Sequence, residues 1–297
     1  MTRSVSTRSR VRARGKASRL GPPKTLAVVS LAAALALIVG STMFSPLMKL
    51  LSAQSAAISQ TMPVGDLPGW RQTGAQDFDK PAKNGLVGEV YGQDMRGYSG
   101  FSDTSGRGIY TPDSVLSVAN GKLDYFLHTA KGSPRVASVV PFGYTGQTYG
   151  RYSVRFKSDS LQGYKIAFML WPSSDKWEDG EVDWPEGGLD GKPYANSAVR
   201  GSLDEFGMQF DPPARAFAPT GMRQWHVATT EWTPQGISWF WDGKLIGRTA
   251  LANAVPITPM RWTLQAETDV GPGTSAPAPS TAGHLEIDWV VQYAYAP

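Results

Sequence analysis

Strict alternation of apolar and polar residues is the clearest pattern along the chain. In residues 150–157 the apolar positions 152, 154 and 156 alternate with polar ones, and a similar period of two runs through residues 284–293. Residues 164–171 are instead apolar almost throughout. Because successive side chains of a strand point to opposite faces, the alternating segments predict half-buried strands and the apolar run predicts a buried one.

Two Xaa-Gly pairs, Asn120-Gly121 and Asp242-Gly243, each stand between segments rich in strand-forming residues. Such pairs are typical of the two-residue type I′ turn of a β-hairpin. The chain also holds 32 Gly and 22 Pro, and it shows no clear amphipathic helix after residue 45. We therefore predict an all-β fold, an antiparallel β-sandwich of the jelly-roll kind.

The N-terminus has a different pattern. Residues 1–24 contain eight Lys or Arg and no acid, and they precede the apolar run Leu26–Phe44. A basic segment before an apolar one is typical of an export signal whose basic end stays in the cytoplasm. Cleavage after the apolar run would release a secreted protein, whereas an uncleaved run is just long enough to anchor the chain in a membrane. Both outcomes place the folded part outside the cytoplasm.

These patterns divide the chain into four parts. They are a basic cytoplasmic region (1–24), a signal peptide or signal-anchor helix (25–45), a linker rich in Ser, Ala, Gln and Pro (46–68) and a folded β domain (69–297).

Charge and residue usage narrow the function. After residue 52 the chain holds 20 Lys or Arg against all 25 Asp and Glu, so the folded part is mildly acidic. A nucleic-acid-binding protein is therefore not expected, because it would need a basic surface. The absence of cysteine excludes thiolate nucleophiles and thiolate metal sites. His128, His226 and His284 lack metal-binding spacing and are interpreted as sheet residues, so we expect no metal at the functional site.

Three carboxylates within six positions are the strongest candidate for chemistry: Glu181, Asp183 and Glu186. On a regular strand Glu181 and Asp183 share a face and Glu186 points away. A β-bulge would return Glu186 to their face, and Pro185 favours one because proline inside sheets is confined mainly to edges and bulges. Two carboxyl groups on one face, about 5–5.5 Å apart, are the apparatus of a retaining glycosidase.

Two plainer interpretations compete with a catalytic one. The first is a solvated surface loop, which acid-rich turns often are. Here, however, a buried strand leads towards the acids, and acids held against an apolar sheet are costly, so they are not expected to be mere solvated decoration. A calcium-binding loop is the other, but the spacing of these acids does not fit the twelve-residue loop motif.

Aromatic and amide side chains near the acids are candidates for binding sugar. Trp177 precedes the three carboxylates, Trp184 stands among them, and Trp171 ends the buried strand before them. Tryptophan offers an apolar face that suits the C–H face of a sugar, although most aromatic residues in strands belong to the core. Gln265 and Glu267 alternate with apolar neighbours and are expected to face the same cleft; the alternative is the solvent face of their strand.

The acidic segment resembles the E-x-D-x-x-E motif of glycoside hydrolase family 16, the laminarinase and lichenase family. The resemblance extends over roughly residues 70–295, and further blocks follow in the family's order: residues 150–157, Trp225-His226, residues 231–234, residues 241–243 and residues 286–290. It implies a concanavalin A-like jelly roll, with Glu181 as nucleophile and Glu186 as acid/base. Asp183 would tune both, and the charges of Glu181 and Asp183 would help Glu186 keep its proton.

The resemblance also implies a substrate class. The expected activity is endo-hydrolysis of a β-1,3 or mixed β-1,3/1,4 glucan with no cofactor, by a chain that we expect to be monomeric. Whether the chain binds a structural calcium ion is left open by the sequence. Residues 198–201 lack the histidine that many members carry on the strand after the motif, which leaves the polymer uncertain. Two alternatives remain. A non-catalytic carbohydrate-binding jelly roll would use the same tryptophans but would not need the three acids, whereas a transglycosylase acting on an exopolysaccharide would share all of these residues.

Overall fold

The computed structural model describes residues 61–202, 207–269 and 274–297. These residues form an all-β fold with a few short helices. The strands are β1 (Trp70–Gln76), β2 (Ile109–Tyr110), β3 (Leu116–Ala119), β4 (Lys122–Ala130), β5 (Ser133–Val139), β6 (Gly150–Ser158), β7 (Tyr164–Pro172), β8 (Val182–Gly188), β9 (Tyr194–Ala198), β10 (Phe210–Phe217), β11 (His226–Thr233), β12 (Gly236–Trp241), β13 (Lys244–Thr249), β14 (Met260–Thr268) and β15 (Gly283–Tyr295). The helices are α2 (Val87–Tyr91), α3 (Gln93–Arg96), α4 (Pro112–Val115) and the 3-10 turns η1 (Trp177–Asp179) and η2 (Ala252–Ala254).

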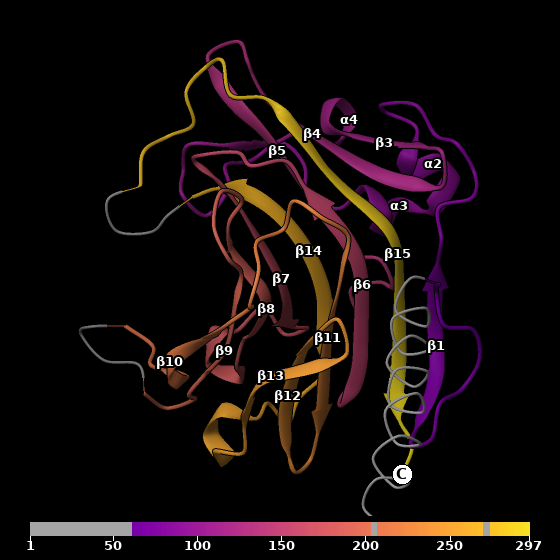
Figure 1. Cartoon of the computed structure of the whole chain (residues 1–297), viewed down its shortest axis with the longest axis vertical. Coiled ribbons are helices and arrows are strands. Elements are labelled where there is room, and N and C mark those ends of the chain that lie inside the picture. The colour runs from indigo at the N-terminus through magenta and orange to yellow at the C-terminus, as the bar shows by residue number, and fades with distance from the viewer. Residues whose placement is uncertain (1–60, 203–206, 270–273) are drawn as a thin grey trace, which may run out of the picture. The chain divides into compact units, whose positions relative to one another are not determined.

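The strands form two layers, as predicted (Figure 1). The first layer, here called the cleft sheet, has the order β10-β9-β8-β7-β14-β5. The second, the outer sheet, has the order β4-β15-β6-β11-β12-β13, with β1 on β15 and β3 on β4. The β4–β5 hairpin links the layers. Among the described strands every pairing is antiparallel except that of β2 with β5. The predicted antiparallel sandwich is therefore confirmed in outline.

The core lies between the two sheets because alternate side chains of each strand point inward. On β7, Ile166 and Phe168 are fully buried in the core, and Phe168 meets Phe156 of β6 edge-to-face at 5.4 Å between ring centroids. Such an aromatic pair contributes about 0.5–1.5 kcal/mol beyond the area it buries. The intervening residues of β7 point to the other face of the cleft sheet, where Lys165 and Met169 line a cleft.

Both predicted hairpin turns are present. Asn120 and Gly121 have φ of 54° and 70° and connect β3 to β4, while Asp242 and Gly243 have φ of 51° and 75° and connect β12 to β13. Positive φ at both central residues is the type I′ geometry, whose twist matches that of the flanking strands.

The predicted signal or anchor helix and most of the predicted linker lie outside the described residues. No helix within the described ranges is long and apolar enough to span a membrane. Met62 and Leu67, which fall in the predicted linker, pack against a buried cluster on the outer sheet that includes Trp289 and Tyr293. The packed structure therefore begins several residues before position 69.

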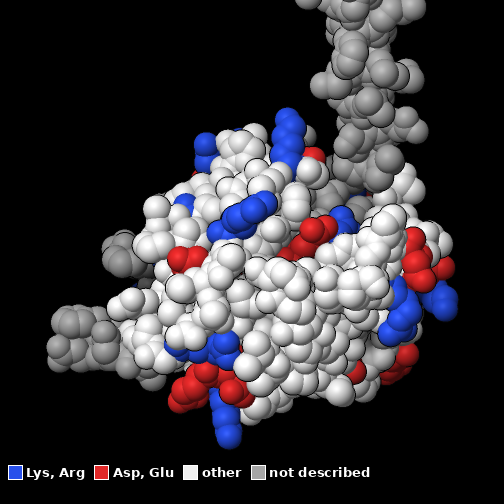
Figure 2. Space-filling model, turned by 90° about the horizontal axis from the view of Figure 1, so that it is seen from below, with Lys and Arg blue, Asp and Glu red and all other residues white. Residues whose placement is uncertain are grey.

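Charged side chains are interspersed on the face that Figure 2 shows. Lys and Arg lie there in small groups close to Asp and Glu, and uncharged residues separate the groups. The acidic balance of the chain after residue 52 is thus not gathered into one block on this face.

Candidate active site

A β-bulge in β8 places the acids. On β7, Ala167 pairs with Glu186 and Met169 with Asp183, so one residue of β7 lies opposite Trp184 and Pro185 together. The pairing of β8 with β9 shows the same irregularity. The extra residue resets the alternation of side chains, and Glu181 and Glu186 both line one cleft of about 1110 Å³. The bulge predicted from Pro185 is confirmed.

Glu181 immediately precedes β8 and is held by a short hydrogen bond. The indole Nε1 of Trp177, in η1, donates to Glu181 Oε2 over 2.6 Å. Burial raises the pKa of Glu181, and the charge of Glu186 raises it further, whereas hydrogen bonds from Asp183 and Trp177 act in the opposite direction. Glu181 is thus a buried carboxyl group whose ionised form is stabilised by two donors.

Asp183 has a role different from the one expected. Its side chain is 1% exposed, and burial, followed by the charges of Glu181 and Glu186, raises the pKa of Asp183 well above its usual range. Burial thus favours the neutral form of Asp183, and a side-chain hydrogen bond joins Asp183 to Glu181. Complete burial therefore disfavours the ionised form of Asp183 that was expected to help Glu186 keep its proton.

Lys165 is a part of the site that the sequence analysis missed. Its Nζ lies 3.0 Å from Glu186 Oε1 and 3.9 Å from Glu267 Oε2. Burial lowers the pKa of Lys165, but the charges of Glu186 and Glu267 outweigh it, so the net shift is upward and the side chain stays an ammonium. The available signal was a single lysine inside the apolar run of residues 164–171.

Gln265 and Glu267 of β14 line the cleft, as expected. Glu267 is 1% exposed, and its Oε1 accepts hydrogen bonds from Thr104 Oγ1 at 2.9 Å and Gln265 Nε2 at 3.2 Å. The Tyr110 hydroxyl donates to the same oxygen. Glu267 is therefore fixed from several sides and is largely withdrawn from solvent at the base of the cleft.

The three tryptophans proposed for sugar binding separate into two groups. Trp171 and Trp177 line the cleft. Trp184 does not: it is 3% exposed, meets Trp241 edge-to-face at 5.6 Å and donates its indole N–H to the carbonyl of Phe240 over 3.2 Å. The prediction that Trp184 stacks on sugar is wrong, because the residue after cleft-facing Asp183 points to the opposite face of the sheet, into the core.

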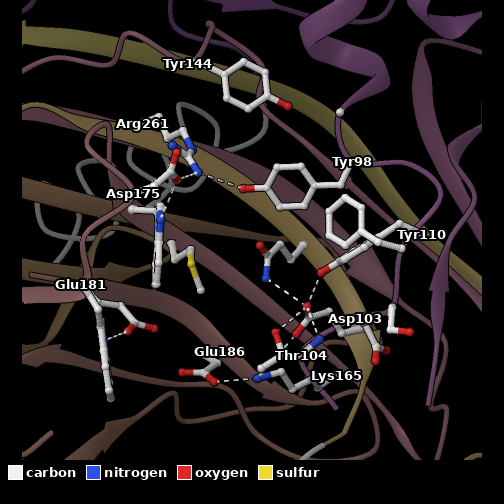
Figure 3. Close-up of a pocket in the computed structure, with 18 of the residues that line it drawn as sticks. Tyr98, Asp103, Thr104, Tyr110, Tyr144, Lys165, Asp175, Glu181, Glu186 and Arg261 are labelled. Carbon is white, nitrogen blue, oxygen red and sulfur yellow. Dashed lines mark hydrogen bonds and ion pairs between the residues drawn. The ribbon is translucent and has the colours of Figure 1, made fainter. Parts of the chain in front are cut away.

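An aromatic wall on the other side of the cleft was also missed. Phe101 and Tyr144 are 52% and 39% exposed, and Tyr98 lies beside both (Figure 3). Arg261 of β14 donates to the Tyr98 hydroxyl at 3.3 Å, pairs with Asp175 and stands over the Tyr144 ring at 5.4 Å. Exposed aromatic faces beside fixed polar groups suit the two kinds of surface that a sugar presents. The aromatic residues lie outside the regular strands, where no periodicity marks them.

No group of three or more His, Cys, Asp or Glu in the described part of the chain is arranged to hold a metal ion. The three histidines lie on β4, β11 and β15, as predicted. The polar side chains that line the cleft include carboxyl groups, a lysine and hydrogen-bond donors.

Comparison with known proteins identifies a family and a curated relative. A sequence model of glycosyl hydrolases family 16 matches residues 108–291. A β-glucanase from Rhodothermus marinus is 30% identical over 122 residues, which are 38% of this chain and 41% of that protein. The chain thus matches less than half the length of this curated relative.

Solved structures share the fold. The laminarinase from Rhodothermus marinus superposes with a TM-score of 0.58 at 19% identity, over 77% of this chain and 98% of that one. A LamA variant from Zobellia galactanivorans, in complex with laminaritriose and laminaritetraose, gives 0.58 at 19% identity, over 75% and 98%. The Bacillus licheniformis β-glucanase gives 0.56 at 16% identity, over 75% and 97%. The family model matches more than half of the chain, and the chain therefore belongs to glycosyl hydrolases family 16.

Proposed function

We propose that this protein is an endo-acting glycosidase that hydrolyses a β-1,3 or mixed β-1,3/1,4 glucan with retention of configuration. The observation that carries the proposal is the shared cleft of Glu181 and Glu186, which the bulge in β8 brings to one face. Membership of the family supports hydrolysis of glycosidic bonds. The β-glucanase and laminarinases similar to this chain support a β-glucan as substrate.

In the proposed mechanism Glu181 is the nucleophile. Its carboxylate attacks the anomeric carbon while Glu186 protonates the departing glycosidic oxygen, which gives a glycosyl-enzyme. Glu186 then removes a proton from water, whose oxygen attacks the same carbon and releases Glu181. Asp183, as a neutral donor, and Trp177 hydrogen-bond Glu181, which holds its attacking carboxylate in place. No cofactor takes part.

Trp171, Trp177, Gln265 and the aromatic wall of Tyr98, Phe101 and Tyr144 are proposed to bind the glucan. They line the same cleft as the acids, and the exposed rings offer apolar faces to sugars. Glu267 is not proposed to touch sugar directly, because it is almost completely buried beneath the cleft and already accepts several hydrogen bonds.

We further propose that the domain works outside the cytoplasm as a monomer, either secreted or held by residues 25–45. The basic segment and the apolar run of the N-terminus support export. A polymeric glucan is also a substrate that a cell meets outside its membrane.

A polysaccharide screen tests the proposed activity. Purified protein is incubated with laminarin, lichenan and a bacterial exopolysaccharide, and both reducing ends and product sizes are followed, with and without oligosaccharide acceptors. We expect short oligosaccharides early in the digestion of laminarin or lichenan, and none from the Glu181→Gln variant. Tight binding without any new reducing ends would favour a binding module instead, and products longer than the donor would favour a transglycosylase.

A further inference from the structure

A lysine stands between two carboxylates at the centre of the cleft sheet. Glu186, Lys165 and Glu267 come from the adjacent strands β8, β7 and β14. Lys165 and Glu267 are direct cross-strand partners, so their side chains share a face. Figure 3 shows Lys165 Nζ directed at Glu186, and the distance between Nζ and Oε1 is 3.0 Å. The side chain of Lys165 is only 9% exposed, so this is a largely desolvated contact.

Glu267 is held so that one oxygen is left for the lysine. Its Oε1 accepts from Thr104, Tyr110 and Gln265. Its Oε2 is buried, has no hydrogen-bond donor within reach in the described structure, and lies 3.9 Å from Lys165 Nζ. A buried carboxylate oxygen without a donor is costly unless a charge compensates it. Lys165 is the cation that faces it.

We propose that Lys165 is a positioning residue that acts through Glu186 by stabilising the Glu186 carboxylate. Glu267 is the carboxylate that balances the charge of Lys165 whenever Glu186 is protonated. While Glu186 carries its proton, the Lys165 ammonium is balanced by Glu267. When the proton passes to the glycosidic oxygen as the C1–O bond breaks and the Glu181–C1 bond forms, the new Glu186 carboxylate gains the same ammonium. In the second step water returns a proton to Glu186, and the balance reverts to Glu267. The assignment rests on the proposed roles of Glu181 and Glu186.

The other titratable groups around this triad do not replace the lysine. Glu181, just before β8, and Asp183 of β8 are acids. Burial and then the charge of Glu186 raise the pKa of Glu181, and burial and then the charge of Glu181 raise that of Asp183. Tyr194 of β9 faces Glu186, and burial followed by the charge of Glu186 raises the pKa of its hydroxyl, so it stays neutral. Arg215 lies over the Tyr194 ring at 4.0 Å rather than against the carboxylate. From the β14 side the facing titratable groups are Glu267, Tyr110 and Asp103.

The two charges of the triad should act on Glu186 in opposite directions. Lys165→Met removes the ammonium and leaves the Glu267 charge, so Glu186 should hold its proton to higher pH. Glu267→Gln keeps the hydrogen bonds at the acceptor oxygen and leaves the ammonium unbalanced, so Glu186 should release its proton at lower pH. A charge at this distance shifts a carboxyl titration by about one to three pH units.

The test uses the full chain in detergent and two readouts. The first is the pH dependence of kcat/KM on laminarin, whose alkaline limb reports loss of the Glu186 proton. The second is the carbon-13 shift of the Glu186 carboxyl, assigned by its loss in Glu186→Gln, which needs no activity. We expect both to move upward by about one pH unit or more in Lys165→Met and downward in Glu267→Gln. Lys165→Met/Glu267→Gln should lie between the two.

Lys244→Met, which removes an exposed lysine of β13 outside the cleft, is the matched control and should move neither readout. If Lys165→Met does not fold, because Glu267 is left buried and unpaired, Glu267→Gln and the double variant decide. Unchanged carboxyl titration, or shifts of the same sign in both single variants, would overturn the inference. Opposite shifts of the carboxyl titration in a protein that cleaves no glycan would contradict the proposed function instead, while leaving the charge relation in place.

Discussion

The indole Nε1 of Trp177 donates to Oε2 of Glu181 over 2.6 Å. The bond stabilises the ionised carboxylate and acts against the rise in pKa that burial of Glu181 produces. Local sequence explains the contact, because η1 ends at Asp179 and Glu181 follows after a single glycine. A tryptophan expected to stack on sugar is thus also a partner of the proposed nucleophile.

Trp177→Phe should therefore change the pH profile and not only substrate affinity. Losing a donor to a charged group costs about 1.5–3 kcal/mol, which corresponds to a shift of roughly one pH unit or more. The pKa of Glu181 should rise, and since the nucleophile must be ionised, the acid limb of kcat/KM should move to higher pH. Trp171→Phe is the control, because that indole lines the same cleft but donates to Asp175. Equal shifts in both variants would contradict the assignment.

Replacing the Asp183 carboxyl group by an amide should preserve most of the activity. Because burial raises the pKa of Asp183 well above its usual range, the native side chain is a neutral donor, and Asp183→Asn supplies a donor of the same size. We expect kcat to fall by about tenfold or less in Asp183→Asn, and by about 100-fold or more in Asp183→Ala, which loses the hydrogen bond to Glu181. Equal losses in the two variants, measured on one β-glucan, would mean that Asp183 works as an anion.

Trp184 should matter for stability and not for affinity. Its side chain is packed in the core against Trp241, so Trp184→Ala should lower the free energy of unfolding by about 3–5 kcal/mol. Urea denaturation measures that loss. The KM of the folded fraction for laminarin should stay within about twofold of the wild type. A large rise in KM with unchanged stability would restore the sugar-stacking role.

The N-terminal segment should be dispensable for catalysis. Deletion of residues 1–56 keeps Met62 and Leu67, which pack against the outer sheet. The truncated chain should therefore fold and keep its kcat/KM. Circular dichroism and activity on laminarin check this, and an unfolded product would show that the domain needs residues before 57.

The fold and the motif could be predicted because their signals are local. Period-two alternation marked β6 and β15, Asn120-Gly121 and Asp242-Gly243 marked two turns, and the placing of Pro185 between Asp183 and Glu186 marked the bulge. Each of these depends on residues close together in the chain, where strand geometry fixes which side chains share a face.

The charge arrangement of the cleft could not be predicted in the same way. The contacts of Lys165 with Glu186 and Glu267 join three strands that are neighbours only because of the sheet order, and the two acids are separated by about 80 residues. The aromatic wall has no periodic signal because Tyr98 and Tyr144 lie in connections between elements. The raised pKa of Asp183 follows from burial, which a sequence does not show.

The measurement that tests the catalytic assignment most directly is azide rescue of Glu186→Ala with a dinitrophenyl β-glycoside. An acidic phenol leaves without a proton donor, so the first step should survive, whereas hydrolysis of laminarin should fall by about 100- to 10,000-fold. The glycosyl-enzyme on Glu181 then lacks a base to activate water and should accumulate. Azide needs no base, so it should restore turnover and give a β-glycosyl azide. Glu181→Gln should be almost inactive, and any product that it forms with azide should be the α anomer. If azide acted on neither variant, or if both kept near-native activity, Glu181 and Glu186 would not be the catalytic pair.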